Sequence, residues 1–492
     1  MSLSNHTFIL KNDGTLWGCG QNDSSQLGLG EDISNKNTFT QIITNTDNVK
    51  SIYCGGNYSF ILKNDNTLWG CGNNNCGQLG LGDVNNRNIF TIIGINTNDI
   101  KSVYCGYKHA FILKNDGTLW GCGDNSYGQL GLGDKTNRTI FTQITVNIDN
   151  IKTIYCSLYN TLVLKNDGTL WGCGNNNEGQ LGLRDITYTS TFTQITTNVN
   201  NIKSVYCGSV HTLILKKDGA LWGCGTGQNG RLGLGDTNNR TIFTQITTNT
   251  DNIKSIYCGG PYTFILKNDS TLWACGYNTN GELGLGDTTD RTTFTQIITN
   301  TNNIKSIYCG YNHTLILKND GTLWGCGLNN QGQLGLVNGS NRTTFTQLTT
   351  NVNDIKYFAN DYSIPNIIKI YDSKIGYTET LDINNFRNIP VDKFEKLKVL
   401  YEKPDNTILN CIISFDKKQT WKTFNGNTWI TVSDTSGTNM IVNCMGIETL
   451  NNLNKSKLIQ GGFTGDLDFK IVMKTNDENK TPSVTKIYIE YK

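Results

Sequence analysis

The string Leu-Trp-x-Cys-Gly occurs seven times in the first two thirds of the chain, and no other feature constrains the fold as strongly. The tryptophans are spaced by 52 residues once and then by 51 residues five times. They are Trp17, Trp69, Trp120, Trp171, Trp222, Trp273 and Trp324. A unit of this length that recurs seven times predicts a repeat architecture, in which each unit buries its apolar faces against its neighbours.

Each unit contains four short segments that are typical of β-strands. In the second unit we expect strands over residues 50–54, 59–63, 67–71 and 90–93. Asn-Asp-Gly or a close variant joins the second strand to the third, which suits the positive φ angles of a tight hairpin. About 18 residues, which include Gln-Leu-Gly-Leu or a variant, join the third strand to the fourth. Because every unit has this loop, we interpret it as structural, with leucine packed inward and glycine allowing close backbone approach.

The composition agrees with strands and turns. The chain has 53 glycines but only four methionines, which disfavours a helical bundle. Charged residues make up 17%, below the ~25% of a typical domain, while hydrophobic residues at 37% supply a core. Both intrinsic disorder and a mainly helical fold are therefore disfavoured.

Seven four-stranded units of this length predict the blades of a closed β-propeller. The first unit begins directly at Ser4-Asn5-His6 and lacks the first strand that the other units have. Residues 355–361 follow the seventh unit in register with that missing strand. We therefore expect a propeller over residues 1–361, whose first blade is completed by 355–361 so that no open strand edge remains.

The repeated pattern YCGxxHTxxLKxDGxLWGCGxNxxGQLGLGD resembles the repeat of the regulator-of-chromosome-condensation family. The resemblance covers residues 1 to about 356 and implies a seven-bladed β-propeller. The functions that it implies range from guanine-nucleotide exchange factors to ubiquitin ligase modules, so the fold does not decide the function. The exchange factors of the family use a β-wedge inserted between blades, and the units here contain no insertion larger than one residue.

The repeat ends near residue 362. We interpret residues 362–390 as a linker or irregular strand pair and residues 391–492 as a β-rich domain, so the fold class is an all-β propeller followed by a β-sandwich-like domain. Within that domain we expect 396–402 and 407–415 to form a hairpin. The segments SFDKKQTWKTFNGNTW and LDFKIVMKTNDENKTPSVTKIYIEYK resemble modules of phage tail and fibre proteins. This resemblance implies that the domain docks the propeller to a larger assembly.

Charge and hydropathy exclude several partner classes. The net charge is +2 with no basic run, which indicates that nucleic acid is not a partner. No stretch approaches 18 consecutive apolar residues, so we expect no membrane span. The N-terminus lacks the charged and apolar regions of a signal peptide. We therefore expect synthesis in the cytoplasm, and release within a phage-like particle is compatible with this expectation.

The four histidines occupy one repeat position, eleven residues before tryptophan: His6, His109, His211 and His313. Tyrosine or asparagine fills this position in the other units, so we expect the histidine-bearing units to alternate around the ring and neighbouring histidines to be separated by a whole blade. Metal ligands must converge within ~2.1 Å of one ion, which residues in separate blades do not do. We therefore expect no metal and no cofactor, and we expect each ring to cap a turn by hydrogen bonding to the backbone.

Thirteen of the 16 cysteines follow the same repeat, and Cys76, Cys411 and Cys444 are additional. No Cys-x-x-Cys pair exists, which excludes zinc ribbons. Stacked disulfides between strands and buried free thiols are the two interpretations, and the lack of a signal peptide favours the thiols. Cys76 lies in a predicted loop and is the candidate reactive thiol.

The sequence contains no Gly-x-Ser-x-Gly elbow, no phosphate-binding Gly-x4-Gly-Lys-[Ser/Thr] loop and no His-Glu-x-x-His motif. The aspartate four residues before each tryptophan is interpreted as a turn residue. Another repeated aspartate is followed by arginine four residues later in most units, as in Asp83 and Arg87. We interpret these pairs as salt bridges between neighbouring loops and expect a protein that is not an enzyme.

The candidate ligand-binding residues lie where the units differ. One variable loop follows the third strand and the other precedes the histidine position. Tyrosines beside polar amides suit recognition of a protein surface or a glycan by stacking and hydrogen bonding, and solvated loops without a ligand are the alternative. The candidates are Tyr107, Lys108, Tyr127, Tyr159, Arg184, Tyr188, Tyr277, Tyr311 and Asn312.

These patterns predict a non-enzymatic binding protein, with a phage-like tail or receptor-binding component as the first hypothesis. Its propeller loops would bind a cell-surface glycan or protein, and its C-terminal domain would contact other subunits of the particle. One alternative is a regulator of a small GTPase that resembles the guanine-nucleotide exchange factors. Another is a structural spacer within a larger particle.

Overall fold

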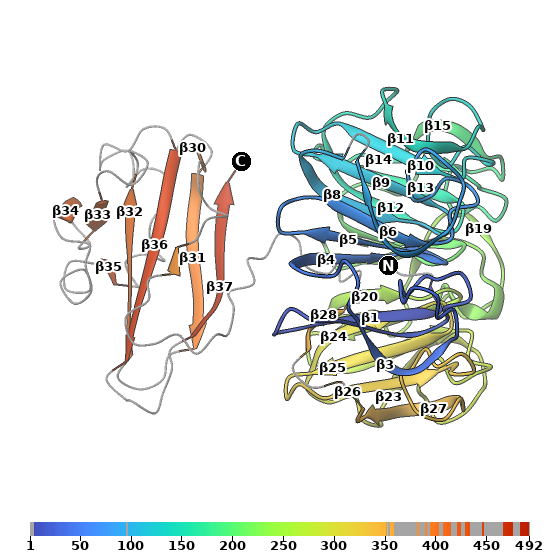
Figure 1. Cartoon of the computed structure of the whole chain (residues 1–492). Helices are drawn as coiled ribbons and strands as arrows, with labels where there is room; N and C mark the ends of the chain where they lie inside the picture. Colours follow the sequence, from blue (N-terminus) through green and yellow to red (C-terminus); the bar gives the residue numbers. More distant parts are fainter. Residues whose placement is uncertain are drawn as a thin grey trace. The chain divides into compact units, whose positions relative to one another are not determined.

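The computed structural model describes residues 4–94, 97–350, 352 and 355–358, and the backbone of separate strands between residues 381 and 491. The chain divides into two compact units, Met1–Ser363 and Ile364–Lys492. The first unit contains seven four-stranded antiparallel sheets, which form the blades of a propeller (Figure 1). The all-β, seven-bladed propeller predicted from the repeat is therefore confirmed.

We letter the blades A to G along the chain and give the strands of each in the order of the sheet. Blade A consists of β28 (Ile355–Phe358), β1 (His6–Lys11), β2 (Leu16–Gly20) and β3 (Lys36–Ile42). Blade B consists of β4 (Val49–Cys54), β5 (Tyr58–Lys63), β6 (Leu68–Gly72) and β7 (Arg87–Ile93). Blade C consists of β8 (Ile100–Cys105), β9 (His109–Lys114), β10 (Leu119–Gly123) and β11 (Arg138–Ile144). Blades D and E consist of β12 (Ile151–Cys156), β13 (Asn160–Lys165), β14 (Leu170–Gly174) and β15 (Thr189–Ile195), and of β16 (Ile202–Cys207), β17 (His211–Lys216), β18 (Leu221–Gly225) and β19 (Arg240–Ile246). Blades F and G consist of β20 (Ile253–Cys258), β21 (Tyr262–Lys267), β22 (Leu272–Gly276) and β23 (Arg291–Ile297), and of β24 (Ile304–Cys309), β25 (His313–Lys318), β26 (Leu323–Gly327) and β27 (Arg342–Leu348).

The observed strands start and end within a few residues of the predicted ones. In blade B the hairpin of β5 and β6 pairs Tyr58 with Gly72 and closes through residues 64–67. The fourth strand, β7, begins at Arg87, three residues before its predicted start. A register shift between Gly70 and Gly72 places Arg87 opposite Gly72 and lengthens the ladder.

The ring closes at blade A, which contains strands from both ends of the repeat region. In β28, Phe358 pairs with Ile9 and Tyr357 pairs with Leu10 of β1. Blade G is joined to blade A by a hydrogen bond from the Tyr308 hydroxyl to the carbonyl oxygen of His6, at 3.0 Å. The edge that β1 would otherwise expose is therefore covered by a strand from the end of the repeat region.

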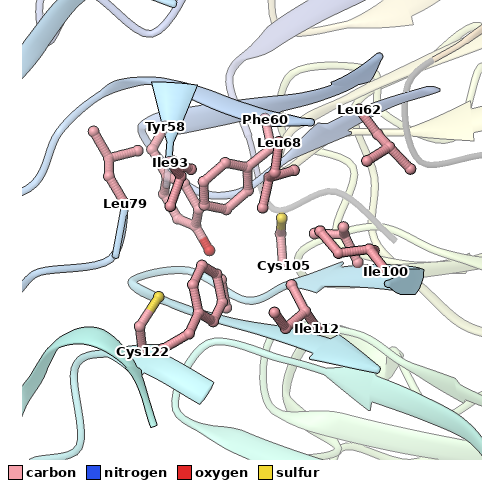
Figure 2. Packing of buried hydrophobic residues seen from close by; sticks show 13 residues of the cluster. Tyr58, Phe60, Leu62, Leu68, Leu79, Ile93, Ile100, Cys105, Ile112 and Cys122 are labelled. Carbon is pink, nitrogen blue, oxygen red and sulfur yellow. The ribbon is translucent and has the colours of Figure 1, made fainter. Parts of the chain in front are cut away.

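The hydrophobic core is divided among the interfaces between neighbouring blades. Seven clusters of buried side chains correspond to the seven interfaces. Figure 2 shows the cluster in which Tyr58, Phe60 and Leu79 of blade B lie against Cys105 and Ile112 of blade C. Full burial of such side chains contributes ~1.5–3 kcal/mol each, so the stability of one blade depends on the blades beside it.

The long loop between the third and fourth strands clamps each blade to the next. From the loop of blade B, Leu81 forms an isolated β-bridge with Ile140 in the outer strand of blade C. The Cys122 thiol of blade C lies 3.4 Å from the Gln78 carbonyl oxygen and donates to it. Gly80 has φ +68°, and a Cβ there would lie 2.8 Å from Phe141. The structural interpretation of this loop is therefore confirmed.

The first strands of neighbouring blades contact each other, as β4 does β8 and β8 does β12. Since the fourth strand lies at the opposite edge of each sheet, the first strands are innermost and the fourth strands outermost. This order decides which loop residues lie near the propeller axis.

The repeated Asp–Arg pairs lie within single loops. Arg87 Nη2 is 2.6 Å from Asp83 Oδ2, and the same contact occurs between Arg138 and Asp134. The prediction of salt bridges between neighbouring loops was therefore wrong, because a spacing of four residues lets both side chains brace one turn. Backbone hydrogen bonds such as that from Gly82 N to Thr139 O, at 2.8 Å, connect neighbouring blades instead.

All fourteen cysteines with described side chains are thiols, and all of them except Cys76 are buried. Burial raises the pKa of Cys71 well above its usual value, so its thiolate is disfavoured. Burial and the nearby Asp124 carboxylate also raise the pKa of Cys76, which does not favour the predicted reactivity.

Thiol titration in denaturant is expected to give the same count before and after reduction, namely all 16 cysteines of the chain. In the folded protein, Cys76→Ser is expected to remove one rapidly labelled thiol, because Cys76 is the one half-buried cysteine among those with described side chains. A count that rises on reduction would show disulfides and contradict the thiol interpretation.

The second unit contributes strands whose backbone is described. β31 (Phe394–Glu402) pairs with β37 (Ser483–Tyr491), and β32 (Thr407–Ser414) pairs with β36 (Asp466–Thr475). The predicted hairpin of 396–402 with 407–415 was therefore wrong, because each strand takes a partner far along the chain. The other strands are β29 (Leu381–Asp382), β30 (Ile389–Pro390), β33 (Trp421–Phe424), β34 (Trp429–Val432) and β35 (Met445–Gly446). The side-chain packing that would make these strands a sandwich lies outside the described residues.

Candidate functional site

Both variable loops of each blade lie at the same end of its sheet, because the first and third strands end there and the second strand begins there. We call this end of the propeller the loop face. In every blade, the N–H that follows the third strand donates to the carbonyl oxygen just before the histidine position. Asp124 donates to Lys108 at 2.8 Å, and Asn175 donates to Tyr159 at 2.8 Å. The two variable loops of a blade are therefore held side by side.

Backbone hydrogen bonds also connect neighbouring blades at the innermost loop. Tyr107 N–H donates to Ser157 O at 3.2 Å, and Gly260 N–H donates to Tyr311 O at 3.2 Å. Tyr311 N–H donates to Ser4 O at 3.0 Å and so links blade G to blade A. These residues follow the innermost strands, so their side chains surround the axis on the loop face.

Five of the candidate tyrosines form what we call the aromatic mouth: Tyr107, Tyr127, Tyr159, Tyr277 and Tyr311. The ring centre of Tyr159 lies 5.3 Å from that of Tyr127 and 6.2 Å from that of Tyr107. All five side chains are half-buried. Tyr107, Tyr127 and Tyr159 thus pack together in a surface that still faces solvent.

Tyr311 connects the two sides of the mouth. Burial raises the pKa of its phenol, the positive charge of Arg231 opposes this rise, and Tyr107 and Tyr277 add to it. These neighbours belong to blades E, C and F, and blade C is not adjacent to blade G. Tyr311 is therefore within electrostatic range of side chains from blades on both sides of the axis.

Charged side chains also lie near the aromatic mouth, and only Lys108 among them was a predicted candidate. Lys108 Nζ lies 5.9 Å from the ring centre of Tyr107. Arg231 and Glu282 replace the glutamine of the Gln-Leu-Gly-Leu segment in blades E and F. Arg231 and Glu282 were not among the predicted candidates, because they lie in a segment that is otherwise constant among the units. The signal that could have identified them is the replacement of glutamine itself, in Arg-Leu-Gly-Leu and Glu-Leu-Gly-Leu.

The remaining candidates lie apart or make few contacts. Arg184 is exposed, and its Nε donates to the Thr197 hydroxyl at 2.7 Å. Tyr188 is 47% exposed beside the outer strand of blade D, and Lys135 Nζ lies 3.7 Å from its ring centre. Asn312 is half-buried next to Tyr311. The structure therefore brings six candidates together around the axis, the five tyrosines and Lys108, but places Arg184 and Tyr188 toward the rim.

The four histidines connect blades and do not cap turns. His109 Nε2 lies 3.1 Å from the Thr161 hydroxyl of the next blade, and His6 Nε2 lies 2.8 Å from the Ser59 hydroxyl. The expectation of a backbone cap was wrong, because the position points into the interface between blades. His313 bonds Thr7 of the first blade at 3.0 Å. The expectation that a whole blade separates neighbouring histidines was therefore wrong for His6 and His313, because closure of a ring with an odd number of blades brings the first and seventh units together.

The hydrogen bonds determine the tautomer of these rings. The Ser59 hydroxyl donates its proton to the Gln26 carbonyl oxygen at 2.8 Å, so His6 Nε2 must carry the hydrogen that it shares with Ser59. The Nδ1 atom is buried and has no hydrogen-bond partner among the described residues. Burial, with a smaller effect of His313, lowers the pKa of His6 to about 3, and burial lowers the pKa of His109 to about 4.

Within the described part of the chain, no three His, Cys, Asp or Glu side chains gather in a way that could hold a metal ion. No helix found there is long and apolar enough to cross a membrane. The loop face carries aromatic, amide and charged side chains.

The sequence profile of the RCC1-like domain matches residues 2–260, which is more than half of the chain. The chain belongs to this family. Profiles of the regulator of chromosome condensation (RCC1) repeat also match residues 269–317 and 304–333 of this RCC1-like protein. The family resemblance read from the repeat is confirmed. The segments that resemble phage tail modules lie outside the matched ranges, so that resemblance stays a prediction.

Two curated proteins show how far the similarity extends. The ultraviolet-B receptor UVR8 of Arabidopsis thaliana is 29% identical over 348 residues, which cover 69% of this RCC1-like chain and 75% of the receptor. The X-linked retinitis pigmentosa GTPase regulator of Homo sapiens is 31% identical over 288 residues, which cover 57% of this chain and 28% of the regulator. The chain thus spans less than a third of that regulator's length.

Among solved structures, Prp20p from Saccharomyces cerevisiae, described with its binding properties to Gsp1p and histones, matches with a TM-score of 0.61 and 19% identity. The match covers 70% of this RCC1-like chain and 88% of Prp20p. Yeast RCC1 (Prp20) bound to Kap60 matches with a TM-score of 0.62 and 18% identity, covering 71% of this chain and 86% of that one. At these identities the likeness shows the fold alone.

Proposed function

We propose that the propeller is a non-enzymatic protein-binding module and that a partner protein docks on the aromatic mouth. The observation that carries this proposal is the convergence of five tyrosines from four blades at the axis of the loop face. Tyrosine supplies a large contact area at a low cost in conformational entropy and is enriched among the residues that dominate binding energy. The backbone hydrogen bonds between blades hold these side chains in place before a partner arrives, which lowers the entropic cost of binding.

The relatives suggest that the partner is a regulated protein. One of them is named a GTPase regulator, and Prp20p is described with its binding properties to Gsp1p and histones. We therefore take a small GTPase as the first partner class and propose a regulatory role for the complex. Because the units have no insertion larger than one residue, we expect stable binding to be easier to detect than accelerated nucleotide release.

Tyr107→Ser and Tyr311→Ser are each expected to weaken binding of a GTPase partner by about tenfold or more, since truncation of an interface tyrosine costs roughly 2 kcal/mol. Immobilised full-length protein would be exposed to a panel of small GTPases loaded with fluorescent GDP, with binding and nucleotide release recorded together. Tyr188→Ser, at the rim, is the matched control and should bind as the unmodified protein does. Unchanged binding in both tyrosine variants would contradict the aromatic mouth as the docking site. No binding by any GTPase would contradict a small GTPase as the partner.

A narrower form of the proposal assigns the protein to a phage-like tail or receptor-binding component. Its ligand would then be a cell-surface protein or glycan, its other partners would be particle subunits that contact the C-terminal unit, and it would leave the cell within the particle. Support for this form comes from the C-terminal resemblance alone. Binding to whole bacterial cells and to a glycan array tests it, and a lack of binding to both would count against it.

A further inference from the structure

Arg231 is a buried cation that forms no direct ion pair with a carboxylate of the described residues, although the negative charges of Asp290 and Glu178 act on it from nearby. Its side chain is only 6% exposed. Nε donates to the Gln228 carbonyl oxygen at 2.8 Å, and Nη2 donates to Asn229 Oδ1 at 3.1 Å. Both acceptors are neutral, and no described residue accepts a hydrogen bond from Nη1. A guanidinium in this position retains donor capacity and positive charge for a group that arrives from outside.

The loop that carries Arg231 has a different backbone conformation from the same loop in the other units. In the other units with glutamine at this position, the side-chain amide accepts a hydrogen bond from the backbone two residues earlier, as Gln129 Oε1 does from Tyr127 N at 2.9 Å. Arginine has no acceptor, so it cannot make this bond. The loop forms a short 3-10 turn instead, η1 (Gln228–Gly230), in which Asn229 has φ +59°.

Lys108 is a second cation near the aromatic mouth that forms no ion pair with a described carboxylate. It is half-buried in the loop before His109, and its Nζ lies 5.9 Å from the Tyr107 ring centre. No carboxylate of the described residues forms an ion pair with it. Its charge, like that of Arg231, is therefore available to a ligand that reaches the aromatic mouth.

The carboxylates of Glu282, Asp290 and Asp124 already accept hydrogen bonds from amide groups of the protein. Asn280 donates to both carboxylate oxygens of Glu282, at 2.7 and 2.9 Å. Asp290 accepts one hydrogen bond on each oxygen, from Asn278 N and Asn229 Nδ2. Asp124 likewise accepts from Ser126 N and Gln129 Nε2. These carboxylates thus accept hydrogen bonds within the protein, whereas Arg231 and Lys108 form no ion pair with a carboxylate of the described residues.

We propose that the aromatic mouth binds an acidic segment of a protein partner, whose carboxylates pair with Lys108 and Arg231 while its apolar side chains lie on the tyrosines. This inference rests on the proposed function and names the chemistry of the partner. Lys108 belongs to blade C and Arg231 to blade E, with blade D between them. A segment with at least two carboxylates fits this separation better than a single small anion does.

The repeat itself supplies variants that preserve the fold. Arg231→Gln restores the residue of the Gln-Leu-Gly-Leu segment, and Lys108→Asn places the asparagine that the same position has at Asn57 and Asn312. Glu282→Gln is the matched control, because it restores the same segment in blade F without removing a cation. Each variant puts into one unit a residue that other units already accommodate.

The test is fluorescence anisotropy of the full-length protein with a labelled peptide of glutamate, serine and leucine, compared with the peptide in which lysine replaces glutamate. The acidic peptide is expected to bind, and more weakly as salt rises. Arg231→Gln and Lys108→Asn should each weaken it about tenfold, the effect of losing one charge-assisted hydrogen bond. Glu282→Gln should leave the affinity unchanged or tighten it.

Several results would overturn this inference: no binding of the acidic peptide, equal binding of the basic one, or unchanged affinity in both cation variants. Full displacement by an equal concentration of inorganic phosphate would also overturn it, because a single anion would then suffice. Binding of the GTPase partner is recorded in parallel. If the tyrosine variants abolish partner binding and the cation variants do not change it, the acidic segment is wrong and the proposed function stands. If the tyrosine variants leave partner binding unchanged, the proposed function itself fails, whatever the peptides do.

Discussion

Deletion of residues 355–361 from the full chain is expected to lower the melting temperature of the propeller by about 5–10 °C. The deletion removes β28 from blade A and leaves β1 with an exposed edge. Ile355, which is 6% exposed in the cluster between blades G and A, is lost with it. Loss of a buried isoleucine costs ~2–5 kcal/mol and each ladder hydrogen bond ~1 kcal/mol, and in a unit of this size each kilocalorie shifts the melting temperature by ~1–2 °C.

The matched control is an equally long deletion at 366–372, within the segment assigned to the linker. Differential scanning calorimetry of the two variants beside the unmodified chain measures the effect of closure. Because each blade is stabilised by its neighbours, opening one interface should also make the transition less cooperative. An unchanged melting curve for the 355–361 deletion would mean that β28 does not stabilise blade A and would contradict closure as a source of stability.

The repeat predicted most of the propeller because each periodic residue has the same contact in every blade. Glycine in the long loop recurs because an outer-strand phenylalanine of the next blade lies against it, as Phe141 does against Gly80. Periodicity does not identify the partner of a residue, however. Asp83 and Arg87 are paired within one loop, whereas His109 reaches Thr161 in the next blade. Both partners are at fixed spacings, so the sequence alone could not distinguish them.

The candidate site was predictable in part, for a related reason. Differences among the units singled out the tyrosines of the mouth, but they do not reveal how far a residue lies from the axis. Tyr311 and Tyr188 were therefore equal candidates, although one approaches the axis and the other lies at the rim. Arg231 was overlooked because its segment is otherwise constant and its charge matters only beside the tyrosines of other blades.

Lowering the pH from 7 to 5 is expected to reduce the free energy of unfolding by about 8 kcal/mol, if the four histidines act independently. Burial lowers the pKa of His6, His211 and His313 to about 3 and that of His109 to about 4. The physical reason is that a charged ring would have to donate from Nδ1, which has no partner among the described residues. A loss of this size is comparable with the total stability of ~5–15 kcal/mol that folded domains have, so the propeller should be much less stable at pH 5 than at pH 7.

The sign follows from where the protons bind. Histidine in the unfolded chain has a pKa near 6.5. Below that pH the unfolded chain therefore binds protons that the buried rings of the folded protein do not bind. Stability is therefore fully present above about pH 6.5 and falls as the pH decreases toward the folded pKa values, about 4 for His109 and about 3 for the other three, by ~1.4 kcal/mol per pH unit for each histidine. Hydrogen bonds from Thr118 lower the pKa of the Asp116 carboxyl, whose usual value already lies below the range from pH 5 to 7, so this group contributes little to the change in stability over that range.

Substitution of single histidines tests this account through the pH slope of stability. Asparagine occupies the same position in blade D as Asn160, so His109→Asn and His211→Asn place a residue that the repeat already holds. Urea unfolding from pH 7 to 5 should show a slope reduced by about one quarter in each variant and by about half in the double variant. Asp116→Asn is the control and should leave the slope unchanged. A free energy of unfolding that stays flat over this range would mean that the rings accept protons while folded, and burial of neutral histidines between blades would then not explain any acid sensitivity of the propeller.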